Sequence, residues 1–220
     1  MKSGFSPIDM KSFPMAEEFY YYTQIAPTSY SITLDIDVTE TKNALKESGL
    51  KFFPAYMYLV SRGIANRPEL RVAVLDGTLG HYDFLNPCYP QLNKKTLTTS
   101  LLFTEYDPSF RAFYEAYCND TRLYGDSTGI LTKKGIPPKN GFVISCIPWF
   151  TFKSFSLHNH GIKDYYFPSF EAGAFRHEDD RILMPLSVTA HHATTEGIHL
   201  NLFFDELNEF LSNPKLWIYD

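Results

Sequence analysis

The sequence predicts an α/β fold, a two-layer sandwich in which helices cover a mixed β-sheet. Segments with strand and helix periodicity intermix along the chain without alternating regularly, which disfavours a doubly wound parallel sheet. Neither GxGxxG after a strand nor GxxxxGK[ST] is present, so nucleotide folds that cradle phosphate are not expected. There is no internal repeat, low-complexity tract or linker, and residues 1–220 are therefore expected to form a single domain.

The composition is that of a folded globular chain with few charges. Of the 220 residues, 44% are hydrophobic and 20% are charged. The net charge of −5 disfavours a nucleic-acid partner. No run of 18 apolar residues is present and the N-terminus lacks a signal-peptide pattern, so no membrane partner is expected. Three widely spaced cysteines (Cys88, Cys118 and Cys146) favour a reduced, cytoplasmic setting.

The first half of the chain predicts short, alternating elements. Residues 16–23 form a short aromatic-rich helix, and residues 31–38 form a half-buried strand because apolar and polar side chains alternate there. The inward side chains of this strand are Ile32, Leu34, Ile36 and Val38. Thr39 or Thr41 can cap the next helix, which stops near Gly49.

A second helix begins around Pro54, which suits a first turn. It buries a helically spaced set of side chains, namely Met57, Val60 and Ile64. Residues 70–75 and 78–84 then predict two strands, joined by a tight turn at Asp76-Gly77.

The second half of the chain predicts longer elements around one irregular loop. A strand is expected at 98–104, a helix at 108–122 and the loop at 125–140. The continuous apolar run at 142–147 is typical of a strand that is buried on both faces. The last strand covers 182–190, and helical spacing of apolar residues follows Gly197.

The segment from His191 to Gly197 is the part of the chain most suited to chemistry. Strand alternation places His192 on the apolar face of the last strand and His191 on the mixed face. General-base catalysis needs a neutral imidazole in a dry site near a substrate hydroxyl, which His192 could supply. The alternative is a core or capping histidine at a strand end.

Two other chemistries have weaker support. His191, His192, Glu196 and His199 are close in sequence, but they straddle a strand end, a loop and a helix start, so no metal site is expected. There is no GxSxG elbow and no cysteine-nucleophile signature. By its position, Glu196 either pairs with a cation or favours the helix N-terminus electrostatically.

The motif HHxxx[D/E]GxH, from His191 to His199, resembles the active-site segment of the chloramphenicol acetyltransferases. The shorter HxxxDG is shared by the acyltransferase cores of 2-oxoacid dehydrogenase complexes and by peptide-synthetase condensation domains. Further stretches extend the resemblance over roughly Phe5 to Phe210; they are residues 51–54, 144–149, 152–155, 164–168 and 183–188.

The resemblance implies a homotrimeric O-acetyltransferase that uses acetyl-CoA and builds each site across a subunit interface. It makes His192 the base and Ser145 the donor to the tetrahedral oxyanion. Without the resemblance, Ser145 would be interpreted as a small strand residue whose hydroxyl forms a hydrogen bond with nearby backbone. The residues matching the acceptor pocket are Tyr22, Thr28, Tyr30, Phe155 and Leu157; those matching the coenzyme A site are Lys51, Phe53, Trp149 and Phe175. Without the resemblance, these aromatics suit a core or interface equally, and Lys51 suits a solvated surface.

The chain departs from the family pattern at three positions. Glu196 stands where the family has an aspartate, and Met15 stands where it has that aspartate's arginine partner. Losing the arginine would leave a carboxylate in need of another partner. Glu171 stands where the family has a threonine beside the acceptor, and a charge there disfavours an apolar neutral acceptor.

Three functions follow from these observations. The first is acetyl transfer from acetyl-CoA to a hydroxyl of chloramphenicol. The second keeps this chemistry but uses another small alcohol or amine, which Glu171 favours. The third is a ligand-binding or scaffolding trimer that has lost turnover through Met15, Glu171 and Glu196.

Overall fold

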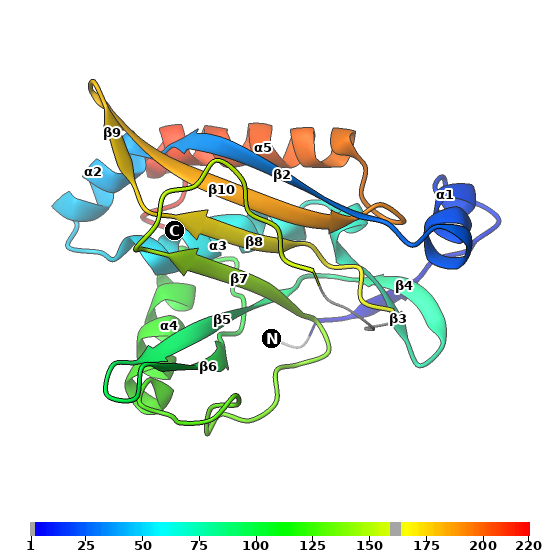
Figure 1. The fold of residues 1–220 in the computed structure, drawn as a ribbon, viewed down its shortest axis with the longest axis horizontal. Coiled ribbons are helices and arrows are strands. Elements are labelled where there is room, and N and C mark those ends of the chain that lie inside the picture. The colour runs from blue at the N-terminus through cyan, green and yellow to red at the C-terminus, as the bar shows by residue number, and fades with distance from the viewer. Residues whose placement is uncertain (1–2, 159–163) are drawn as a thin grey trace.

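The computed structural model describes residues 3–158 and 164–220, which form a mixed sheet with helices packed on one face (Figure 1). The large sheet has the strand order β2-β10-β8-β7-β5-β6, and β9 pairs with β10. Its strands are β2 (Ser29–Asp37), β5 (Asn86–Asn93), β6 (Thr98–Phe103), β7 (Gly141–Ile147), β8 (Ser169–Gly173), β9 (Arg176–Glu178) and β10 (Arg181–His191).

The pairing confirms a mixed sheet. β7 runs parallel to both β5 and β8, while β10 runs antiparallel to β2, β8 and β9. A smaller antiparallel sheet, which the sequence did not predict as a separate unit, has the order β1-β4-β3. Its strands are β1 (Phe5–Pro7), β3 (Val72–Leu75) and β4 (Thr78–Tyr82).

Helices cover one face of the large sheet, behind it in Figure 1. The ring of Phe170 on β8 lies 5.2 Å from that of Phe203 on α5 and 5.9 Å from that of Phe142 on β7, so aromatic packing joins the two layers. The helical elements are α1 (Ala16–Tyr20), the π-helical turn η1 (Tyr21–Ile25), α2 (Thr39–Glu47), α3 (Phe52–Ala65), η2 (Pro68–Arg71), α4 (Phe110–Tyr124), α5 (Gly197–Ser212) and η3 (Pro214–Leu216).

The other face of the sheet is polar and carries the segment 150–157, which passes in front of the sheet in Figure 1. Side-chain hydroxyls of the strands hold this segment. Ser187 donates to the carbonyl of Phe155 at 2.6 Å, and Thr33 accepts from the Phe155 N–H at 3.3 Å. Thr189 accepts from the Leu157 N–H at 3.3 Å. This segment therefore replaces a second helical layer on that face.

Two expectations for the N-terminal third were wrong in detail. Leu34, predicted to point inward, is 41% exposed because β2 lies at the edge of the sheet. Val38 holds the N-cap position of α2 and no threonine side chain caps the helix. The Asp37 carboxylate, one residue before the cap, accepts from the Thr39 N–H at 3.0 Å. The Thr41 hydroxyl instead donates to the carbonyl of Leu211. The predicted stop near Gly49 is confirmed by its positive φ of 67°.

Three strands of the large sheet, β5, β8 and β9, were not predicted as such. β5 contains Pro87 and Pro90, which normally argue against a strand of this kind. β8 is short and carries Glu171, so its apolar pattern is interrupted. The run at 142–147 is a strand, but it is not buried on both faces. Phe142 and Ile144 are buried on the helix side, whereas Val143 and Ser145 on the other side are half-buried.

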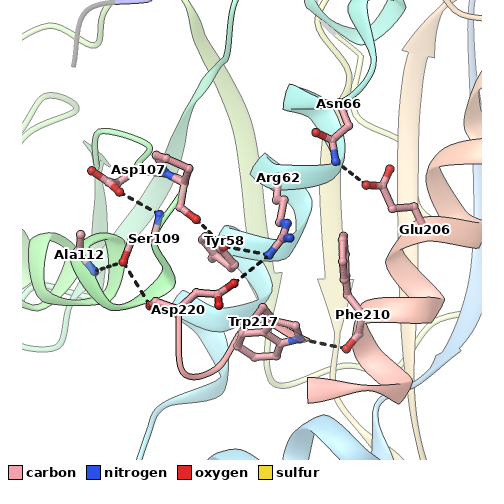
Figure 2. Close-up of polar contacts among 11 residues, drawn as sticks. Tyr58, Arg62, Asn66, Asp107, Ser109, Ala112, Glu206, Phe210, Trp217 and Asp220 are labelled. Atoms are coloured by element: carbon pink, nitrogen blue, oxygen red, sulfur yellow. Dashed lines mark hydrogen bonds and ion pairs between the residues drawn. The ribbon is translucent and has the colours of Figure 1, made fainter. Parts of the chain in front are cut away.

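The C-terminal residues close the helical layer (Figure 2). Trp217 is fully buried, and its indole N–H donates to the carbonyl of Phe210 at 2.9 Å. The Asp220 carboxylate lies 3.7 Å from Arg62 Nη1, and the Ser109 hydroxyl donates to the main-chain oxygen of Asp220 at 3.2 Å. The last residues thereby tie α3, α4 and α5 together. Among the described residues, no helix is both long and apolar enough to cross a membrane.

Candidate active site

His192 lies directly after β10, where the chain leaves the sheet. Its backbone N–H donates to the carbonyl of Thr28 at 2.9 Å, so the start of β2 holds the main chain there. The imidazole stacks on the ring of Tyr22, with centroids 4.2 Å apart and an interplanar angle of 19°, and lies 5.2 Å from the ring of Tyr30. His192 Nδ1 is buried and has no hydrogen-bond partner among the described residues. Two aromatic rings therefore orient a half-buried imidazole.

The turn after β10 is held by hydrogen bonds that leave the His192 ring free. His191 Nδ1 accepts from the Ala193 N–H at 3.2 Å, which requires that nitrogen to be unprotonated. Burial lowers the pKa of His191, and the neighbouring His192 adds to this effect. The Tyr30 hydroxyl donates to the carbonyl of Thr195 at 3.1 Å, and burial, reinforced by Glu196, raises its pKa to about 12. The Tyr30 hydroxyl thus remains a donor at neutral pH.

Glu196 finds its partner at the start of α5. Its side chain accepts from the backbone N–H of His199, and its own N–H donates to His199 Nδ1 at 2.9 Å. This is a reciprocal cap of the helix N-terminus, with histidine in the place usually taken by glutamate or glutamine. Among the described residues, no lysine or arginine pairs with Glu196, and Met15 is itself buried before α1. Of the two predicted roles for Glu196, the structure favours the helix N-terminus.

Ser145 lies on β7 in register with Glu171 on β8, and Glu171 is in register with Ser187 on β10. In-register neighbours project from the same face, which places this row under the segment 150–157. The Ser145 hydroxyl is half-buried and makes no hydrogen bond within the described part of the chain. A free hydroxyl at this place can serve as a donor to a bound group.

His192 and Ser145 lie far apart within one protomer. Ser145 is in register with Ser187, two strands away, and His192 follows Ser187 by five residues. At about 3.3 Å per residue, the offset along β10 alone is about 16 Å. The two side chains therefore cannot act on the same carbonyl from within one subunit.

The predicted acceptor residues fall into two groups. Tyr22, Thr28 and Tyr30 surround His192, as their ring and backbone contacts show. Phe155 and Leu157 belong to the segment 150–157, on the same face as Ser145, and the ring of Phe155 lies 5.6 Å from that of Phe152. Glu171, the third member of this group, is 1% exposed, and burial raises its pKa to about 7.

The predicted coenzyme A residues lie around the start of α3 and the carboxyl ends of β7 and β8. Lys51 is exposed immediately before α3, and Trp149 is 66% exposed just after β7. Phe175 follows β8, and its ring lies 5.0 Å from that of Phe52 on α3. Phe53 differs from the others because its ring packs on Tyr89 and Tyr117 at the edge of the core.

Lys42 belongs to the same region and was missed by sequence reasoning. Its ammonium lies 4.3 Å from the centroid of the Phe175 ring, which places a second cation near Lys51 and the N-terminus of α3. Helix N-termini and cations together favour anions such as phosphate groups. Nothing in the sequence spacing links α2 to this place. Among residues 3–158 and 164–220, no three His, Cys, Asp or Glu side chains form a metal-binding group.

Comparison with solved structures identifies the fold first. The fold matches that of a solved chloramphenicol acetyltransferase with a TM-score of 0.82 at 23% identity, over 94% of this chain and all of the other. It also matches a dihydrolipoamide acetyltransferase from Azotobacter vinelandii with a TM-score of 0.64 at 13% identity, over 91% and 86% of the two chains. The architecture is thus one that known acetyltransferases adopt.

The sequence defines the family. The profile of the chloramphenicol acetyltransferase family matches residues 3–208. A chloramphenicol acetyltransferase from Clostridium perfringens is 34% identical over 97% of this chain and 98% of its own length. One from Bacillus pumilus is 32% identical over 98% and 97% of the two chains. This chain therefore belongs to the chloramphenicol acetyltransferase family, as its motifs predicted.

Proposed function

We propose that this protein transfers the acetyl group of acetyl-CoA to a hydroxyl of chloramphenicol. The observation that carries the proposal is the His192 imidazole, held between aromatic rings at the end of β10 in a chain of this family. In this mechanism His192 removes the proton of the acceptor hydroxyl, and the oxygen attacks the thioester carbonyl. The tetrahedral intermediate then expels coenzyme A as a thiolate, and the protonated His192 donates the acceptor's proton to this thiolate.

Ser145 supplies the donor to the oxyanion of this intermediate. Its hydroxyl is free in the described structure, which supports a role toward a bound group. Removal of one such donor typically lowers kcat by about 10²–10³-fold. Glu196 acts on the site indirectly, because its cap sets where α5 begins and hence the path of the turn that follows His192.

The active assembly is proposed to be a homotrimer with each site between two subunits. The separation of His192 from Ser145 within one protomer supports this, since a neighbouring copy would have to bring one of them to the other. One subunit would supply His192, Tyr22, Thr28 and Tyr30, and its neighbour would supply Ser145 and the segment with Phe155 and Leu157. A cytoplasmic location fits the acetyl-CoA requirement.

Coenzyme A is proposed to bind at the start of α3. Lys51 and Lys42 offer cations for phosphate groups, and Trp149, Phe175 and Phe53 offer aromatic surface. Bound acetyl-CoA supplies an activated acetyl thioester. No metal has a place in this proposal.

The test is thiol release from acetyl-CoA in the presence of chloramphenicol. We expect His192→Ala to lower kcat by about 10²–10⁴-fold, the usual contribution of a general base. His177→Ala changes an exposed histidine on β9 and should leave the rate unchanged. Unaltered turnover in His192→Ala would contradict the proposed base.

The second candidate function uses another small alcohol or amine as acceptor. The buried carboxyl of Glu171 beside the acceptor residues favours it, because a polar partner on the ligand would satisfy this group. A panel of hydroxyl and amine acceptors, compared by kcat/KM with chloramphenicol, separates the two candidates.

The third candidate function, a ligand-binding trimer without turnover, would bind coenzyme A in calorimetry and release no thiol with any acceptor.

A further inference from the structure

Glu171 lies in the middle of the polar row on the sheet face opposite the helices. Its neighbours along β8, Phe170 and Ala172, are fully buried on the helix side, so the Glu171 side chain projects the other way. The register places it between Ser145 on β7 and Ser187 on β10. Glu171 is thus adjacent to the proposed oxyanion donor.

The Glu171 carboxyl has no partner in this position. It is 1% exposed, and neither carboxyl oxygen has a hydrogen bond among the described residues. The Ser187 hydroxyl already donates to the carbonyl of Phe155. The Ser169 hydroxyl lowers the pKa of Glu171, but this offsets only part of the increase that burial causes. A buried carboxylate without a cation or donors is unfavourable, so the neutral acid is the preferred form.

The groups around Glu171 do not supply a compensating charge. Tyr56 from α3 and Tyr165 from the segment before β8 both have pKa values raised by burial and by the charge of Glu171 itself. Burial likewise raises the pKa of Cys146, next to Ser145 on β7. These three groups are neutral at pH 7. Among the described residues, no lysine, arginine or histidine is paired with Glu171.

We infer that Glu171 must hold its proton for acetyl transfer to proceed, and that it controls the reaction through the field at Ser145. As a neutral acid it leaves the negative oxyanion unopposed and offers a second O–H donor beside the serine. As a carboxylate it would place a like charge next to the oxyanion in a poorly solvated site. The Glu171 proton is not transferred in the reaction. The proton that leaves the acceptor hydroxyl passes to His192 and then to the coenzyme A thiolate. The inference rests on the proposed role of Ser145.

The pH profile of kcat tests this inference. Burial raises the pKa of Glu171 to about 7, so wild-type kcat should fall by roughly tenfold or more as the pH rises above that value. A histidine base alone would give only a rise with pH. Glu171→Gln keeps the size of the side chain and supplies a permanent N–H donor without a charge. We expect this variant to lose the fall of kcat at high pH. The matched control is Glu47→Gln, an exposed acid at the end of α2, which should keep the wild-type profile.

Superimposable profiles for wild type and Glu171→Gln would overturn the inference. A second measurement does not need an active enzyme or a folded variant. Difference infrared spectra of the wild type across about pH 7 should show the carbonyl band of one buried carboxylic acid disappearing. Absence of that band at the acidic end would also overturn it. If chloramphenicol is acetylated at no pH while the band is present, the proposed function fails and the protonated state of Glu171 stands.

Discussion

At the residue scale, the two acids that depart from the family pattern have opposite environments. Glu196 is half-buried and satisfied by the N-terminus of α5, so it needs no arginine at the position of Met15. Glu171 is buried and unsatisfied. Both were identified from the sequence as departures. Their surroundings could not be predicted, because the cap of Glu196 depends on where the helix starts and the burial of Glu171 depends on the segment 150–157 crossing the sheet.

The raised pKa of Glu171 predicts a pH-dependent stability. Since the folded state holds this proton up to about pH 7 and the unfolded state loses it near pH 4.5, the unfolded chain binds fewer protons between these values. The free energy of unfolding should therefore fall as the pH rises from about 4.5 to 7, by about 3 kcal/mol for this group. Glu171→Gln should remove that fall and be the more stable protein at pH 8.

Urea unfolding of both proteins at one protein concentration, measured at several pH values, checks this prediction. Glu47→Gln, an exposed acid, is the control and should follow the wild type. Parallel curves for wild type and Glu171→Gln would show that the Glu171 carboxyl is paired in the folded protein.

At the element scale, strands and helices with a clean period were predictable and interrupted ones were not. The alternation in β10 and the helical spacing in α3, α4 and α5 are strong, and all four elements are confirmed. β5 was missed because its prolines lie at positions that tertiary context tolerates. The segment 150–157 has no periodicity that would predict its path. Its position depends on hydroxyls of strand residues that are distant from it in the sequence.

Because a buried serine hydroxyl holds the segment 150–157, we expect the loss of that hydroxyl to lower the free energy of unfolding. Ser187 is fully buried, and its hydroxyl donates to the carbonyl of Phe155 at 2.6 Å. Ser187→Ala leaves that carbonyl unsatisfied and should lower the free energy of unfolding by about 1–3 kcal/mol. Ser156→Ala, in the same segment but exposed, is the control and should change it by less than about 0.5 kcal/mol. Equal stabilities of the two variants would mean that the bond does not hold the segment.

At the scale of the whole molecule, the proposed mechanism requires a second subunit, because the polar face of the sheet with Ser145 lies far from the turn at His192 within one protomer. The fold class was predictable from patterns, and the family from the motif at His191 to His199. The separation of His192 from Ser145 was not predictable, because the order of strands in the sheet cannot be read from the sequence. It places the two groups on different strands, far apart along the sheet.

Subunit complementation tests this account most directly. His192→Ala and Ser145→Ala would each be prepared alone, then unfolded, mixed in equal amounts and refolded together. If each site takes His192 from one subunit and Ser145 from its neighbour, about a quarter of the sites in randomly mixed trimers contain both. The account predicts that the mixture regains about a quarter of wild-type kcat, far above either variant refolded alone. Activity of the mixture no greater than the average of the two variants would contradict it.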